Sequence, residues 1–482
     1  PKTDYTGLNY KKPTNEPFDR SKRPVSGPSP LVKVPEFWET KFDNGIKVIG
    51  TKSNEIPTVA IQLTLVGGHK FDAADPKKSG LAQITASMMD ESTQNYSAEA
   101  MQEELRKIGS SINIYANRTS TVVSINTLKK NLDKTLQLAE EKLLRPGLQQ
   151  IDFDRVIKQQ MEGIKASQQD PSAIAGQVFD RLLYGDEHIY SVPTSGIEET
   201  VANITLDDVK AFYNKYYSPN LGELVIVGDV DQKDILPKLG FLKSWPNKKV
   251  AIPTLPPAKP GDKTKIYLVD KPNAPQSQIR VGYMTDLKYD AIGDYFKSYL
   301  MNYPLGGAFN SRINLNLRED KGWTYGAGAY FSSTEDPGPY QAYAGVLATA
   351  TDSAVVEFMK EITDYREKGI TDDELAFMRN SVGQRDARSY ETPGQKAGFL
   401  RTIAHYNLDK SYVDQQTKII NTISKDEINK LAKKYLDDDS IYILVVGDGA
   451  TNREKLEQLG YEVVELDAKG DVIDKNSIKV DK

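Results

Sequence analysis

The stretch ITLDDVKAFYNKYYSPNLGELVIVGD, residues 204–229, returns in similar form as ISKDEINKLAKKYLDDDSIYILVVGD, residues 423–448. Both copies are 26 residues long, start 219 residues apart and end in Gly-Asp. Each has the pattern of an amphipathic helix, a short turn and an apolar strand, with Thr205 and Ser424 as the expected helix caps. The chain therefore repeats a helix–strand unit, and this repeat decides the fold.

A second pair of segments supports the repeat. IKVIGTKSNEIPTVAIQLTL, residues 46–65, is similar to IYLVDKPNAPQSQIRVGYMT, residues 266–285, and each predicts a strand, a turn with proline and another strand. Between the copies, SWPNKKVAIPTLPPAKPGDK has the proline content of a semi-rigid linker. We therefore expect two homologous α+β domains, each a β-sheet with helices packed on one face, at residues 37–243 and 264–482, joined by a linker at 244–263.

The N-terminal segment differs from both domains. Residues 1–36 are rich in Pro, Lys, Ser and Gly and lack amphipathic periodicity, which predicts an extended arm. The chain opens with PKTDYTGLNYKKP instead of a methionine and an apolar signal core, so either a leader was removed or the chain was trimmed. Removal of a leader would favour the bacterial periplasm over the cytoplasm.

Composition excludes several classes of protein. With 482 residues, 39% hydrophobic and 27% charged, the chain can bury large cores, and no apolar run is long enough to span a bilayer. The formal net charge of −5 lacks the basic surface that nucleic-acid binding needs, so we expect no nucleic-acid partner. The absence of cysteine rules out disulfides, thiolate metal sites and a cysteine nucleophile.

The histidines do not have the spacing of a metal site. A hydrolytic zinc needs about three protein ligands and an open position, usually two histidines and a carboxylate where cysteine is absent. Only His69, His188 and His405 occur, far apart, and none has a second histidine four residues away. We expect each to be solvated or hydrogen-bonded to the backbone, and we expect this chain to hold no metal or other cofactor.

One helix nevertheless has the layout of an active-site helix. SGLAQITASMMDEST, residues 79–93, carries apolar residues at helical spacing along one side. The other side, where a metal-binding helix would present its ligands, holds Gln83, Ala86 and Ser87.

The order of these segments resembles a known family. LTLVGGHKFD (63–72), SGLAQITASMMDEST (79–93), DRVIKQQMEGIKASQQDP (154–171) and the unit ending in VIVGD are similar to pitrilysin- and insulinase-type zinc peptidases. The resemblance is to the branch that contains mitochondrial processing peptidase and the core proteins of the cytochrome bc complex, and it extends from about Phe37 to the C-terminus. It implies that the two domains form half of a clam-shell chamber.

The resemblance also identifies what has been lost. The family's zinc motif, H-x-x-E-H with a further glutamate ligand about 75 residues on, matches Gln83, Ala86 and Ser87, with Glu162 at the distant position. Gln83 and Ser87 cannot replace two imidazoles, and Ala86 cannot accept a proton. Glu162 is expected to be an exposed helix carboxylate, so the resemblance implies a degenerate zinc site.

A second motif is retained. LREDKGWTY contains Arg318 and Tyr325, which as a bare pattern would indicate a surface salt bridge and a packing tyrosine. In peptidases of the family the C-terminal half supplies such an arginine and tyrosine to hydrogen-bond the substrate backbone opposite the zinc. The resemblance therefore implies that Arg318 and Tyr325 bind substrate in trans.

Two functions follow from this combination. The first is a non-catalytic, zinc-less subunit of a heteromeric zinc metallopeptidase that degrades peptides, paired with a homologous zinc-binding subunit that carries H-x-x-E-H. The alternative is a structural or peptide-binding scaffold of the core-protein type with no proteolytic role. Retention of Arg318 and Tyr325 favours the first, and the formation of homodimers stays open in both.

The missing ligands predict that the isolated chain binds no stoichiometric zinc and hydrolyses no peptide. Elemental analysis of the purified chain, together with a peptidase assay in added zinc, measures both properties. About one tightly held zinc per chain, as catalytic sites bind it, would contradict the inactive-subunit interpretation.

Overall fold

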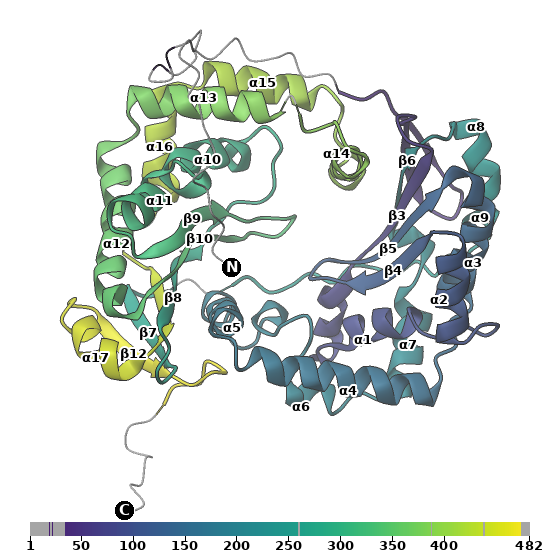
Figure 1. Ribbon diagram of the computed structural model, residues 1–482, viewed down its shortest axis with the longest axis horizontal. Coiled ribbons are helices and arrows are strands. Elements are labelled where there is room, and N and C mark those ends of the chain that lie inside the picture. The colour runs from purple at the N-terminus through teal and green to yellow at the C-terminus, as the bar shows by residue number, and fades with distance from the viewer. Residues whose placement is uncertain are drawn as a thin grey trace, which may run out of the picture.

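The computed structural model describes residues 19, 22, 34–258, 261–386, 388–436 and 439–473. Most of the predicted arm at residues 1–36 lies outside this part of the chain. The described residues form two halves, each built on a six-stranded sheet, that curve around a common centre (Figure 1).

The first sheet belongs to the N-terminal half and has the strand order β1-β2-β6-β3-β5-β4. Strands β2 and β6 run parallel, and the other neighbours are antiparallel. Its strands are β1 Trp38–Lys41, β2 Lys47–Lys52, β3 Thr58–Val66, β4 Ser111–Ala116, β5 Ser120–Leu128 and β6 Gly222–Gly228.

The second sheet repeats this plan with the order β12-β7-β11-β8-β10-β9. Its strands are β7 Lys265–Asp270, β8 Gln276–Met284, β9 Thr324–Phe331, β10 Pro339–Leu347, β11 Tyr442–Gly447 and β12 Glu462–Leu466. Five strands correspond in order and direction, from β2 with β7 to β6 with β11. The sixth differs, because β1 pairs antiparallel with β2 whereas β12 pairs parallel with β7.

The repeated helix–strand unit has the predicted form in both halves. Helix α7 (Leu206–Tyr216) precedes β6, and α16 (Lys425–Tyr435) precedes β11. Thr205 and Ser424 cap these helices with reciprocal capping boxes, because the third helical residue returns a carboxylate to the cap. The prediction of two homologous α+β domains is therefore confirmed.

The remaining helices divide between the halves. In the N-terminal half they are α1 Leu81–Met89, α2 Ala98–Lys107, α3 Leu132–Leu144, α4 Gln150–Ser167, α5 Pro171–Tyr184, α6 Glu198–Val201, α8 Gln232–Ile235 and α9 Gly240–Lys243. In the C-terminal half they are α10 Asp294–Asn302, α11 Arg312–Asn314, α12 Thr351–Lys368, α13 Asp372–Asp386, α14 Pro393–Tyr406, α15 Tyr412–Thr422 and α17 Gly449–Glu457. None of the helices in the described ranges is long and apolar enough to cross a membrane.

Each half covers one face of its sheet with its own helices. Leu224 and Ile226 of β6 point into the N-terminal core, where they meet residues of α1, α3 and α7. In the C-terminal half, Ile443 and Val445 of β11 point into the matching core with α10, α12 and α16. Figure 1 shows most of these helices on the outer side of the two sheets.

The inner faces of the sheets are covered by an exchange of helices. Val225 and Val227 of β6 pack against Phe399, Leu400 and Ile403 of α14, a helix of the C-terminal half. Strand β6 is fully buried along its length because both of its faces have a cover. Lys47 of β2 also donates a hydrogen bond of 3.0 Å to the carbonyl of Ala404 in the last turn of α14.

The second sheet receives the equivalent helix in return. Leu444 and Val446 of β11 pack against Val178, Phe179 and Leu183 of α5, a helix of the N-terminal half. In Figure 1, α5 and α14 both lie on the inner side of the ring that the halves form. The predicted arrangement, helices on one face of each sheet, therefore holds for each half's own helices, and the exchanged helix covers much of the other face.

The stretch predicted as a linker contains neither helix nor strand in its described residues, 244–258 and 261–263. Its start is held to the N-terminal half, where Trp245 is buried and Asn220 donates a hydrogen bond of 2.8 Å to the carbonyl of Val250.

The exchange predicts that Leu400→Ala destabilises the N-terminal half, although Leu400 belongs to the C-terminal half. Leu400 is fully buried, so its truncation should cost about 2–5 kcal/mol. The additional substitution Trp323→Phe removes the tryptophan of the C-terminal half. The two that remain, Trp38 and Trp245, lie in the N-terminal half and report on its unfolding. Their fluorescence during denaturation in urea should show the lowered midpoint.

Val356→Ala on α12 is the matched control, because Val356 is 46% exposed and its loss should change the free energy of unfolding by about 0.5 kcal/mol or less. An unchanged midpoint for the N-terminal tryptophans in Leu400→Ala would show that α14 does not support the first sheet.

Candidate functional site

Helix α1 carries three of the positions that match the zinc motif, and a buried carboxylate holds its first turn. Asp72, in the short helix η1 (Gly68–Ala74), accepts hydrogen bonds from the backbone N–H groups of Gly80 at 2.9 Å and Ala82 at 3.0 Å. Gly80 has φ +104°, and a Cβ atom there would lie 2.8 Å from the carbonyl oxygen of Ser195. Contacts within the N-terminal half thus place α1.

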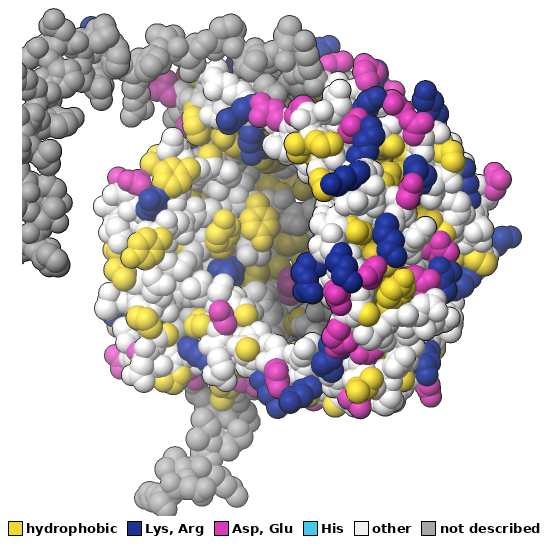
Figure 2. Space-filling model, turned by 45° about the vertical axis from the view of Figure 1, so that its right-hand side comes forward, with side chains coloured by type: hydrophobic (Ala, Val, Ile, Leu, Met, Phe, Trp, Pro, Cys, Tyr) yellow, Lys and Arg dark blue, Asp and Glu magenta, His cyan; other side chains and the backbone are white. Residues whose placement is uncertain are grey.

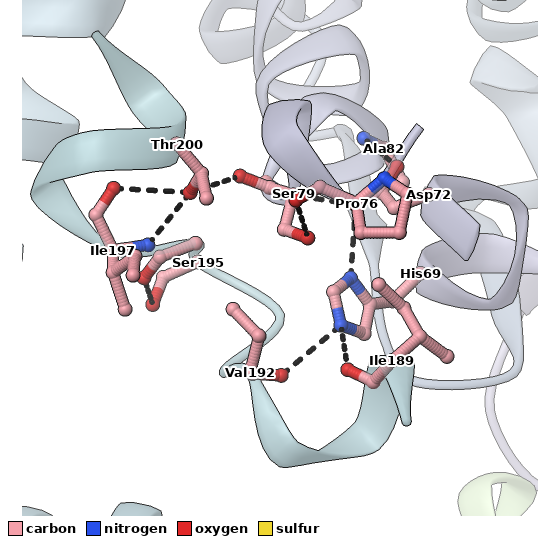
Figure 3. A network of polar contacts seen from close by, with 12 residues as sticks. His69, Asp72, Pro76, Ser79, Ala82, Ile189, Val192, Ser195, Ile197 and Thr200 are labelled. Carbon is pink, nitrogen blue, oxygen red and sulfur yellow. Dashed lines mark hydrogen bonds and ion pairs between the residues drawn. The ribbon is translucent and has the colours of Figure 1, made fainter. Parts of the chain in front are cut away.

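His69 is part of this anchor (Figure 3). Its ring is fully buried, with Nδ1 2.9 Å from Asp72 Oδ2 and Nε2 3.1 Å from the carbonyl oxygens of Ile189 and Val192. Both ring nitrogens face acceptor oxygens, so the ring is held from both sides. The predicted backbone bonding of a lone histidine is confirmed here, with a carboxylate added.

The other two histidines also have partners within the protein. His188 Nδ1 accepts a hydrogen bond of 3.0 Å from the Tyr190 backbone, and burial, with Arg118 nearby, lowers the pKa of His188. His405 differs from the expectation, because it contacts two carboxylates. Its Nδ1 lies 3.0 Å from Glu223 Oε2, and its Nε2 is paired with Glu335.

Helix α1 is enclosed on two sides, which the sequence did not predict. Ala86 is fully buried against the N-terminal core, while Ile84 and Met88 pack on the other side against a cluster that includes α4. Gln83 and Ser87 are half-buried. The side of α1 that was expected to present ligands is thus partly core.

The residue opposite Gln83 on α4 is Gln160, two positions before the expected Glu162. Gln83 Nε2 lies 3.4 Å from Gln160 Oε1, and Gln160 in turn donates a hydrogen bond of 2.6 Å to the carbonyl of Ser195. The Glu162 side chain is 66% exposed and lies 4.0 Å from Lys158. Helical periodicity explains the difference, because Gln160 lies four residues from both buried Val156 and buried Ile164.

These positions do not fit a zinc ion. The Gln83 and Gln160 amides bond to each other, the Ala86 side chain has no ligand atom, and Glu162 is exposed to solvent. Within the described ranges, no three His, Asp or Glu side chains gather in a way that could hold a metal.

Arg318 lies on the π-helical turn η8 (Leu315–Asp320), which leads into β9. The centre of its guanidinium group lies 4.4 Å from the centre of the Phe309 ring. This cation–π contact orients the planar guanidinium group. Glu319 Oε1 lies 3.6 Å from Nη1, which is beyond hydrogen-bond distance, and Nη1 is buried with no hydrogen-bond partner among the residues that the structure describes. The side chain is one-third exposed and keeps donors for another acceptor.

Tyr325 stands at the start of β9, the edge strand of the second sheet, and 91% of it is exposed. A turn links it to Arg318, in which Gly322 donates a hydrogen bond of 3.1 Å to the Arg318 carbonyl. The degenerate helix α1 and strand β9 lie in opposite halves of the molecule (Figure 1). The structure thus brings Arg318 and Tyr325 to one end of β9, separate from Gln83, Ala86 and Ser87.

Comparison with known proteins identifies the family to which this fold belongs. The family described as Insulinase (Peptidase family M16) matches residues 47–184, and the Peptidase M16 inactive domain matches residues 203–382. The chain belongs to the M16 peptidase family. It resembles the "Uncharacterized zinc protease YmxG" of Bacillus subtilis with 22% identity over 84% of this chain and 97% of that protein.

Two further proteins are similar to this chain over most of their length. The "Non-peptidase homolog YmxG" of Helicobacter pylori is 23% identical over 84% of this chain and 92% of its own length. A crystal structure of a peptidase M16 inactive domain from Pseudomonas fluorescens superposes with a TM-score of 0.78 at 21% identity, over 86% of this chain and 98% of that one. The chain has the fold of half a clam-shell, and Gln83, Ala86 and Ser87 stand at its positions that match the family's zinc motif.

The contacts of His405 predict a loss of stability at high pH. Hydrogen bonds that His405 donates to the carboxylates of Glu223 and Glu335 raise the pKa of His405 from 6.5 to about 9. A raised pKa in the folded state means that the charged ring contributes its full stabilisation below pH 6.5 and loses it as the pH rises to about 9. His405→Gln should therefore lower the free energy of unfolding by about 2–3 kcal/mol more at pH 6 than at pH 10.

Urea titrations of the wild type and the variant at the two pH values measure the difference. Glu335→Gln replaces a half-exposed carboxylate that pairs with His405. It should remove part of the difference in stability between pH 6 and pH 10 without disturbing the packing of α14. Equal destabilisation by His405→Gln at both pH values would exclude this role of the charge.

Proposed function

We propose that this chain is the non-catalytic subunit of a heteromeric zinc metallopeptidase that degrades peptides. In this proposal a homologous partner carries H-x-x-E-H and the zinc, and this chain lends Arg318 and Tyr325 to the partner's active site. The observation that carries this proposal is that Arg318 Nη1 has no hydrogen-bond partner among the described residues and that Tyr325, on the edge strand β9, is almost fully exposed.

The chemistry of the two side chains suits this task. A planar guanidinium group can hold a peptide carbonyl with two parallel donors, and a phenol O–H can add a third. Donors placed in advance stabilise the negative charge that develops on a carbonyl oxygen under attack. The cation–π contact with Phe309 supports such placement of Arg318 before substrate binds.

The separation of the pair from α1 supports action in trans. Within this chain the ligand positions have become glutamine, alanine and serine, and they lie in the other half of the molecule. Opposite the zinc of the proposed partner, these donors would face the carbonyl under attack. A purely structural scaffold needs no such donors.

Replacement of Arg318 by alanine or of Tyr325 by phenylalanine should lower kcat of the reconstituted complex by roughly 10²–10³-fold, the usual loss for one oxyanion donor. Arg318→Lys keeps the positive charge but lacks the two parallel N–H donors of a guanidinium group, so it should recover only part of the rate of peptide hydrolysis. The measurement is peptide hydrolysis by this chain co-purified with a homologous H-x-x-E-H subunit, with size-exclusion profiles to confirm assembly.

Arg453→Ala is the matched control, because Arg453 is an arginine of similar exposure that pairs with Glu465 on α17 and β12. It should leave kcat unchanged. If both site variants assemble and cleave peptides at the wild-type rate, the pair has no catalytic role and the scaffold function replaces the one proposed.

A further inference from the structure

A cavity of about 440 Å³ lies in the C-terminal half where α10 meets the β9–β10 edge of the second sheet. Its volume lies within the range of small-ligand sites. On the face shown in Figure 2, the molecule is hollowed between its halves, and the wall on the side of the C-terminal half is largely uncharged with scattered hydrophobic side chains. Aromatic residues make up about half of its lining, and they are Tyr289, Tyr295, Phe296, Tyr299, Tyr330, Phe331 and Tyr343.

The walls are fixed before any ligand binds. Tyr289 stacks on Tyr406 with ring centres 3.7 Å apart, and Tyr299 accepts a hydrogen bond of 2.5 Å from Arg385. Tyr330 and Tyr343 meet edge to face with ring centres 6.0 Å apart, and both remain about 40% exposed. Rings held in this way bind a further ring with little loss of conformational entropy.

Two glycines let neighbouring parts of the cavity wall pack closely on the sheet. A Cβ atom at Gly328 would lie 3.2 Å from the Tyr343 hydroxyl and 3.1 Å from the Gly306 carbonyl oxygen. A Cβ atom at Gly306 would lie 2.5 Å from Ala329 Cβ. Glycine at both positions allows the turn Tyr303–Gly307 (η7) to approach β9 closely.

One residue that lines the cavity has a buried side-chain oxygen with no hydrogen-bond partner among the described residues. Asn302, at the end of α10, is 2% exposed and lines the cavity. Its Nδ2 donates a hydrogen bond of 2.7 Å to the carbonyl of Ala329, which fixes the amide orientation. Its Oδ1 has no hydrogen-bond partner among the described residues. A buried acceptor of this kind costs free energy until a donor reaches it.

We infer that this cavity receives an aromatic side chain of a bound peptide whose ring ends in a hydrogen-bond donor, as tyrosine does. The rings of the wall would contact the faces and edges of the guest ring, and the phenol O–H would donate to Asn302 Oδ1. This inference rests on the peptide-handling function proposed above and adds a side-chain preference to it. The site is separate from Arg318 and Tyr325, neither of which lines the cavity.

Fluorescence anisotropy with this chain alone tests the inference without a catalytic partner. The probes are labelled glycine- and serine-rich peptides of about 12 residues that differ only in a central Tyr, Phe or Ala. The tyrosine peptide should bind tightest, the phenylalanine peptide roughly 5- to 20-fold more weakly because Asn302 stays unpaired, and the alanine peptide weakest.

Variants locate the binding. Asn302→Leu should bring the affinities for the tyrosine and phenylalanine peptides to within about twofold of each other, because the acceptor is gone. Tyr343→Ala removes a half-exposed wall ring, so it should keep the fold and weaken the binding of both peptides. Tyr115→Ala is the matched control, since Tyr115 is 48% exposed on β4 of the other sheet, and it should have no effect.

Equal affinity for the tyrosine and alanine peptides would overturn the inference. So would weakening by Tyr115→Ala with none by Tyr343→Ala, which would place the peptide on the first sheet. If Asn302→Leu does not fold, the Tyr-to-Phe ratio of the wild type and the effect of Tyr343→Ala still decide. A negative result in these binding experiments would not bear on the proposed role of Arg318 and Tyr325, because that role is tested by peptide hydrolysis in the complex.

Discussion

Strands β6 and β11 are apolar on both faces, so other elements must cover each strand on both sides. Helices of the same half supply one cover, and the second comes from the other half, through α14 on β6 and α5 on β11. Because each sheet is completed by the other half, neither half is a closed hydrophobic unit by itself. The relative position of the halves, and hence the space between them, depends on this exchange.

The exchange also brings distant parts of the chain into contact with the strand that carries the candidate site. The turn between β9 and β10 holds Glu335, which pairs with His405 of α14, and Asp336, which lies 2.7 Å from Lys70 of η1. Lys70 belongs to the N-terminal half, so the two strands are tied to both halves at this turn. The edge strand that presents Tyr325 and the aromatic cavity is therefore held in place from both sides.

Local patterns predicted much of this molecule from sequence. Caps at Thr205 and Ser424, helical and strand periodicities and the internal repeat define the two homologous domains, because each of these signals lies within a few residues. No local pattern states which sheet a helix covers, so the placement of α5 and α14 was missed, although the apolar run LVIV of β6 indicates burial on two faces. The same limit applies to Gln160, which faces Gln83 through tertiary packing, and to the cavity around Asn302, whose rings come from separate helices and strands.

The exchange of α5 and α14 also bears on how such a chain can arise. A polypeptide made of one half alone would have a bare apolar sheet face and a helix that fits the same face of a second copy. Two copies would complete each other by domain swapping, so a symmetric dimer of half-length chains is a natural ancestor of the duplicated form. Once a linker joins the two copies in one chain, substitutions in one half no longer occur in the other. One half can then lose its metal ligands while the other keeps an arginine and a tyrosine.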